Sequence, residues 1–133
     1  MKTKLLLFLL LLFAQPSYAW VNQEDINWQK TEYNLSKYED VIKQEDYNPD
    51  ESAKILKDAL KFLSKADVDT ETKTLLTGYF CYMISKDLKR SGHKIKAAYI
   101  LKMAKICKIA NHDGTLNEEN AEKMMTLVQT PKP

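Results

Sequence analysis

The sequence predicts an all-helical fold, a compact bundle of about five helices. The 133 residues include only three glycines, and no alternation of apolar and polar residues, the pattern of half-buried strands, is sustained. The four prolines fall in the leader, at one helix start and among the last three residues, so none interrupts an apolar repeat. We expect two αα-hairpins followed by a C-terminal helix.

Residues 1–19 are predicted to form a secretory signal peptide. A short basic start precedes an unbroken apolar run from Leu5 to Phe13. Small residues at Ser17 and Ala19 then fit a cleavage site. The apolar run is too short for a membrane-spanning helix, which needs about 20 residues. We therefore expect an exported protein that is soluble after cleavage and spans no membrane. A bacterial periplasm is the expected compartment, with secretion as the alternative.

Cleavage would leave a single helical domain over residues 20–129 and a flexible tail over 130–133. It would also remove Lys2 and Lys4, which changes the balance from 20 basic and 18 acidic residues to 18 of each. Domains that bind nucleic acids usually carry a clear basic excess. A mature net charge near zero therefore argues against a nucleic-acid partner.

The first helix is expected from about Gln23 to Asp46. Its apolar stripe has members spaced seven, three and four residues apart: Trp28, Leu35, Tyr38 and Ile42. Residues 20–51 include nine acidic and three basic side chains. Tyr33 and Tyr47 fall outside the stripe, so we expect them to be exposed beside carboxylates. Exposed tyrosines are favoured at interfaces, which makes both candidates for partner contact.

The second and third helices have clear signals at their ends. The second is expected to begin at Pro49, because Asn48 can cap it and proline fits the first helical position. The third is expected from about Thr70 to Lys89, before a glycine stop. Gly78 lies in its middle at a propensity cost of about 1 kcal/mol. Close approach of a neighbouring helix would offset that cost.

The fourth helix is expected from about His93 to Ala110. Eleven of its last fourteen residues are apolar, so we expect it at the centre of the bundle. The fifth helix is expected to begin near Thr115 or Asn117. An Ile-Leu-Lys triplet recurs 45 residues apart in the second and fourth helices. That recurrence leaves repeat-like stacking open as an alternative to a plain bundle.

Cys81 and Cys107 are predicted to form a disulfide. Antiparallel pairing of the third and fourth helices brings them within about one helical turn, and export favours oxidation. The bond would close a loop of about 26 residues, which the chain-entropy model equates with about 3–4 kcal/mol of stability. The alternative is two buried free thiols that act as small apolar side chains.

We expect no metal centre and no bound cofactor. The two histidines, His93 and His112, flank the fourth helix and lie about 28 Å apart at 1.5 Å per residue, too far to share one ion. The residues around Asp113 resemble half of a calcium loop. However, its first and twelfth ligand positions fall on Ile109 and Asn120, where calcium needs carboxylates. A helix stop followed by an N-cap explains the same residues.

A basic cluster is expected around the turn between the third and fourth helices. Residues 52–110 include 13 basic and five acidic side chains. The cluster itself consists of Lys86, Lys89, Arg90, Lys94 and Lys96. One interpretation is solvated charge that complements the acidic first helix. The other is a docking patch for an acidic protein or an anionic envelope surface.

No catalytic motif occurs in the chain. The nucleophile elbow, the zinc-protease helix and the phosphate loop are all missing, so we expect no enzyme. The expected function is binding to another protein, for example as an envelope inhibitor or immunity-type protein that meets a secreted toxin or an envelope component. Two alternatives stay open, a helical-repeat adaptor of an envelope complex and a small-ligand carrier.

Overall fold

The computed structural model describes residues 23–129, which fold into five helices. The helices are α2 (Gln23–Ile42), α3 (Pro49–Leu63), α4 (Thr70–Arg90), α5 (Lys94–Ile106) and α6 (Glu118–Gln129). Within this part of the chain the β-structure is one isolated bridge between Ala110 and Leu116. The predicted all-helical bundle is confirmed. The predicted signal peptide and the predicted tail lie outside the described residues.

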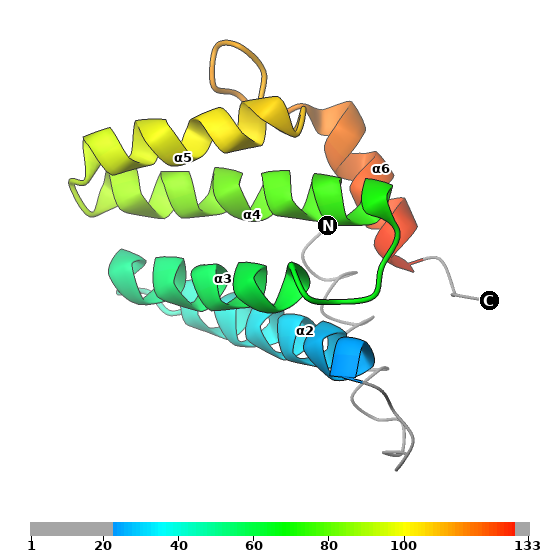
Figure 1. Ribbon diagram of the computed structural model, residues 1–133. Coiled ribbons are helices and arrows are strands. Elements are labelled where there is room, and N and C mark those ends of the chain that lie inside the picture. Colours follow the sequence, from blue (N-terminus) through cyan, green and yellow to red (C-terminus); the bar gives the residue numbers. More distant parts are fainter. Residues whose placement is uncertain (1–22, 130–133) are drawn as a thin grey trace.

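The helices form two antiparallel hairpins, α2–α3 and α4–α5 (Figure 1). In this view α4 lies between α3 and α5, while α6 crosses the end of α4. Among the described helices, α5 packs against α4 alone. The side of α5 that faces away from α4 therefore has no helix against it.

Three helix starts are capped by side chains, which accept hydrogen bonds from the first free amides. Asn48 Oδ1 accepts from the Asp50 amide at 2.9 Å, as the sequence predicts for α3. Asp69 Oδ2 accepts from the Thr72 amide at 3.0 Å at the start of α4. Asn117 Oδ1 accepts from the Asn120 amide at 3.1 Å, so α6 starts at the second of the two predicted positions.

Two predicted helix ends are wrong. α2 ends at Ile42 rather than near residue 46. α5 ends at Ile106 rather than at Ala110. Just after α5, Lys108 adopts a left-handed conformation with φ of 62°. The Ile109 and Ala110 amides donate hydrogen bonds to the Ala104 carbonyl, at 3.0 and 3.1 Å. These bonds end the helix.

The hydrophobic core is built from α2, α3, α4 and α6. Its fully buried large side chains include Leu56, Leu63, Leu76, Phe80, Ile84 and Met124. From α5, only Ala97 and Ala104 are buried. The predicted central position of α5 is therefore wrong. Ile100 and Leu101 of α5 are partly buried against the core, and its other large apolar side chains are exposed.

Gly78 shows how closely α4 approaches the chain that follows α5. A Cβ atom built on Gly78 would lie 2.6 Å from the Cys107 Cβ and 2.8 Å from the Ile109 Cγ1. Real Cβ atoms essentially never come that close to other atoms. The close approach predicted at Gly78 is confirmed, and it explains why a residue of low helix propensity occupies the middle of a 21-residue helix.

Candidate functional site

The basic end of the α4–α5 hairpin contains a surface hollow of about 430 Å³. Three of the five predicted basic residues line it together, Lys86, Lys89 and Arg90. All three are exposed. Lys94 and Lys96 are also exposed, but they lie in the first turn of α5 and do not line the hollow. The rest of the lining comes from Tyr82, Ser85, Leu101 and Gly114.

A second, smaller hollow of about 150 Å³ shares Lys86 and Arg90 with the first. Tyr47 lines this second hollow and is only half-exposed. Tyr47 is thus less exposed than predicted, because the Arg90 guanidinium lies over its ring at 5.9 Å, and its role in partner contact stays a prediction. Tyr33 is exposed on α2 as predicted, and it lines neither hollow.

A buried carboxylate joins three segments beneath the basic end. Asp87 is 2% exposed. Its Oδ2 accepts a hydrogen bond from the Ser52 hydroxyl of α3 at 2.5 Å, and its Oδ1 accepts one from the Tyr47 hydroxyl at 3.4 Å. The Arg90 guanidinium in turn donates to the Tyr47 hydroxyl. These hydrogen bonds connect the α2–α3 connection and α3 to the last turns of α4. They therefore hold Arg90 in place at the basic end.

The first helix is less acidic at its surface than its sequence suggests. Glu32 and Glu39 are only 1% and 4% exposed. Burial raises the pKa of Tyr79, and the charge of Glu39 adds to the effect. Burial also raises the pKa of Tyr38, with Asp87 as the second cause. The acidic side chains of α2 thus belong in part to the interior, where they cannot complement surface lysines.

The two cysteines are neighbours but are free thiols in the structure. Cys107 touches Gly78, and Cys81 lies on the same face of α4 one turn further along. Burial raises the pKa of Cys81 to about 11, with a smaller contribution from Cys107. Such a thiol is protonated at neutral pH and is a poor nucleophile. The disulfide stays a prediction.

Asp113 stabilises the turn between α5 and α6 by accepting hydrogen bonds. Its Oδ1 accepts from the Thr115 hydroxyl at 2.6 Å and from the Thr115 amide at 3.0 Å. These hydrogen bonds lower the pKa of Asp113. Gly114 follows with φ of 86°, a conformation that favours glycine. The residues that resemble half of a calcium loop therefore form a hydrogen-bonded turn before the cap of α6.

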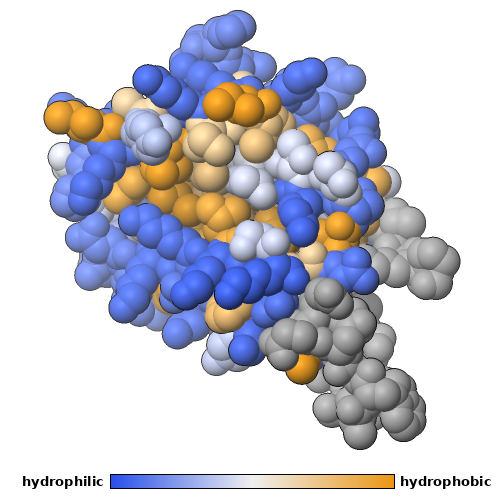
Figure 2. Space-filling view, in the orientation of Figure 1, coloured by the Kyte–Doolittle hydropathy of each residue, from blue (hydrophilic) through white to orange (hydrophobic). Residues whose placement is uncertain are grey.

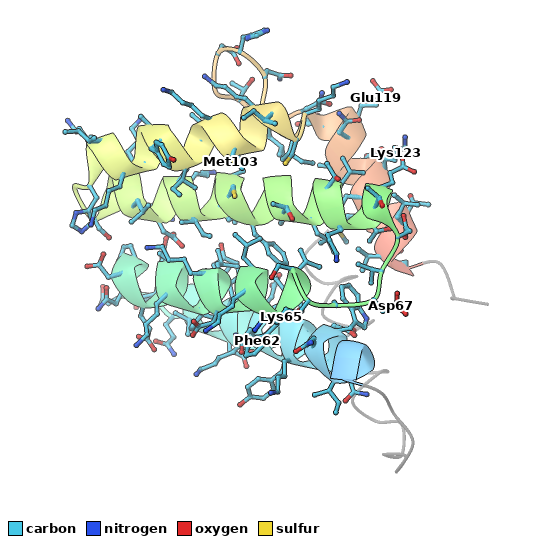
Figure 3. The ribbon with its side chains drawn as sticks, in the orientation of Figure 1. Phe62, Lys65, Asp67, Met103, Glu119 and Lys123 are labelled. Carbon is cyan, nitrogen blue, oxygen red and sulfur yellow. The ribbon has the colours of Figure 1, made fainter. Side chains whose placement is uncertain are left out.

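A stripe of large apolar side chains runs along the outer face of α5. The exposed fractions are 90% for Ile95, 69% for Tyr99, 41% for Met103 and 70% for Ile106. Spacings of four, four and three residues place them on one face of the helix, and we name them the α5 stripe. Figure 3 shows Met103 on the side of α5 turned toward the viewer. Figure 2 shows apolar surface over α5 and below it, bordered by hydrophilic side chains.

Sequence reasoning missed the α5 stripe because it assigned the apolar residues of this helix to the core. The signal was present in their spacing, which separates the stripe from the Ala97 and Ala104 side. In the described part of the chain, Tyr33 is the one large hydrophobic residue outside α5 with comparable exposure. Contiguous apolar surface of this kind marks interaction sites more often than scattered exposed residues do.

Neither a metal site nor a membrane span is found among residues 23–129. No group of three or more His, Cys, Asp or Glu side chains in this range could hold a metal ion. The helices described here also include none with the length and apolar character needed to cross a bilayer.

No protein-family model, curated protein or solved structure matches the chain. Function is therefore inferred from the geometry and chemistry of these surfaces.

Proposed function

We propose that this protein works by binding another protein and that the α5 stripe is its main contact surface. The observation that carries the proposal is the exposure of four large apolar side chains on one face of an outer helix. Removing apolar surface from water is the dominant favourable term in most protein associations. A helix that buries two alanines and exposes Ile95, Tyr99, Met103 and Ile106 is suited to a partner rather than to the core.

The α5 stripe is held in place before any partner arrives. The Ser85 hydroxyl of α4 donates to the Ala97 carbonyl at 2.8 Å inside the α4–α5 contact. A connection of only three residues, with Gly92 at φ of 86°, joins the two helices. Surfaces held on rigid elements lose less entropy on binding, which favours affinity.

The basic end adds long-range attraction to this surface. Lys86, Lys89 and Arg90 lie together at one end of the molecule. Clustered charge of one sign speeds the encounter with an oppositely charged partner, and salt weakens the effect. The partner proposed here is therefore acidic.

The proposal includes an exported location, which the predicted signal peptide at residues 1–19 supports. An exported binding protein of this size suits an inhibitor or immunity-type role toward a secreted toxin or an envelope component. An adaptor role in an envelope complex is the alternative. In an oxidising compartment Cys81 and Cys107 are proposed to form a disulfide that fixes the end of α5 to α4.

Thiol titration of the denatured protein, isolated from its native compartment, tests the disulfide. We expect no reactive thiol before reduction and two after it. Reduction should lower the free energy of unfolding by about 3 kcal/mol, because the loop of about 26 residues is released. Two reactive thiols without reductant would show that the pair stays reduced.

The double variant Ile95→Ser with Ile106→Ser tests the contact surface. Both side chains are exposed, so the melting temperature should stay within about 3 °C of the wild type. Quantitative capture from the native extract should show at least a tenfold loss of one defined partner. The expected size follows from two apolar anchors, each contributing about 1 kcal/mol or more.

The matched control is Tyr33→Ser, which removes the other large exposed apolar side chain of the described residues. Capture by this variant should equal that of the wild type. If Tyr33→Ser loses the partner and the α5 double variant keeps it, the contact surface is on α2 and the proposal is wrong.

A further inference from the structure

The length of the α5 stripe and the charge of the lysines beside it indicate what kind of partner segment can bind there. We propose that it receives an acidic amphipathic helix of the partner protein, laid along α5. This inference rests on the proposed function. It goes beyond that function by assigning the secondary structure and the charge of the segment that binds.

The length and straightness of the stripe fit a helix. From Ile95 to Ile106 the helix advances about 16 Å, which is three turns. Spacings of four, four and three residues make one row of side chains along the axis. Amphipathic helices present apolar side chains at the same spacings, and two such rows interdigitate when the helices lie side by side.

The charge beside the stripe selects an acidic partner. α5 carries four lysines and no acidic residue. At 100° per residue, Lys96 and Lys102 fall on opposite sides of the stripe. Both are exposed, and the two ion pairs found among the described residues, His93–Asp50 and Lys123–Glu71, involve neither. Carboxylates along the edges of a partner helix would complement these two lysines.

A second copy of the chain fits the stripe poorly. The large apolar side chains that are exposed on that copy, within the described residues, are those of its own α5 stripe and Tyr33. Pairing α5 with α5 would bring the lysines of both helices together without a counter-charge. Like charges in such contacts lower affinity, so a dimer through α5 is disfavoured.

The experiment uses two synthetic probe peptides of 18 residues. Both carry leucines at helical spacing along one face. One has glutamates at the flanking positions, and the other has lysines there. Fluorescence anisotropy of each labelled peptide is measured while the purified protein is added. We expect the glutamate peptide to bind at least tenfold more tightly at low ionic strength, with the preference shrinking as salt is raised.

Two variants and one control locate the interaction. Ile95→Ser with Ile106→Ser should weaken binding of the glutamate peptide at least tenfold. Lys96→Glu with Lys102→Glu should reverse the preference between the two peptides. Lys37→Glu, a charge reversal at an exposed position on α2, should leave the preference unchanged.

Several results would overturn the inference. Equal affinity for the two peptides would do so, and so would a preference that survives Lys96→Glu with Lys102→Glu. Binding to phosphatidylglycerol vesicles that is lost in the Ile95→Ser, Ile106→Ser variant would assign the stripe to lipid. A dimer in sedimentation that the same variant abolishes would assign it to a second copy.

The inference and the proposed function can fail separately. If the natural partner is lost with the Ile95→Ser, Ile106→Ser variant but is kept by Lys96→Glu with Lys102→Glu, the segment that lies on the α5 stripe is not acidic, and the acidic part of the partner faces the basic end instead. The proposed function then stands and the inference is wrong.

Discussion

Replacing Asp87 with alanine is expected to lower the free energy of unfolding by about 3 kcal/mol. The carboxylate is 2% exposed and accepts hydrogen bonds from the Ser52 and Tyr47 hydroxyls. Hydrogen bonds to a charged group contribute about 1.5–3 kcal/mol, and the buried Ser52 hydroxyl would lose its strongest acceptor. Urea denaturation followed by circular dichroism gives the change directly.

A double-mutant cycle separates this network from a general effect of truncation. Asp87→Ala, Ser52→Ala and the double variant should give a coupling energy of about 1–2 kcal/mol. Asp87→Asn keeps an acceptor and should lose less stability than Asp87→Ala. Additive effects of the two alanine substitutions would mean that the 2.5 Å hydrogen bond contributes nothing to stability.

Gly78→Val is expected to lower the free energy of unfolding by about 2–3 kcal/mol, although valine has the higher helix propensity. Its Cβ would lie 2.6 Å from the Cys107 Cβ and 2.8 Å from the Ile109 Cγ1, so α4 would be pushed away from the end of α5. Thermal unfolding at fixed pH measures the loss, which should appear as a fall in melting temperature of about 8 °C or more.

Thr74→Val is the matched control on the same helix. Thr74 is exposed, so the added valine meets no packed neighbour there. Its effect should stay within about 0.5 kcal/mol. If Gly78→Val were equally mild, the two segments could separate without loss, and the close approach at Gly78 would not determine how α5 packs.

Local signals in the sequence predicted the helices well, because caps and glycine stops act within a few residues. Asn48 and Gly78 are both found in the roles expected of them. The end of α5 could not be predicted in this way. It depends on the left-handed Lys108 and on the bridge between Ala110 and Leu116, which form only when the chain turns back toward α6.

The candidate site was harder to predict, because burial depends on which neighbours a helix receives. Counting apolar residues placed α5 at the centre, but the only residues of α5 that are fully buried are Ala97 and Ala104. Counting charges made α2 an acidic surface, although Glu32 and Glu39 are buried. Asp87 lies within a basic stretch of sequence and would be counted as solvated charge, yet it is a buried acceptor for Ser52.

Hydroxyl-radical footprinting of the protein alone and in complex with its captured partner tests the central claim most directly. Tyr99 and Met103 react readily with radicals when exposed, and both belong to the α5 stripe. The proposal predicts that their oxidation falls at least fivefold in the complex while that of Tyr33 on α2 is unchanged. Protection of Tyr33, with Tyr99 and Met103 oxidised as fast as in the free protein, would contradict it.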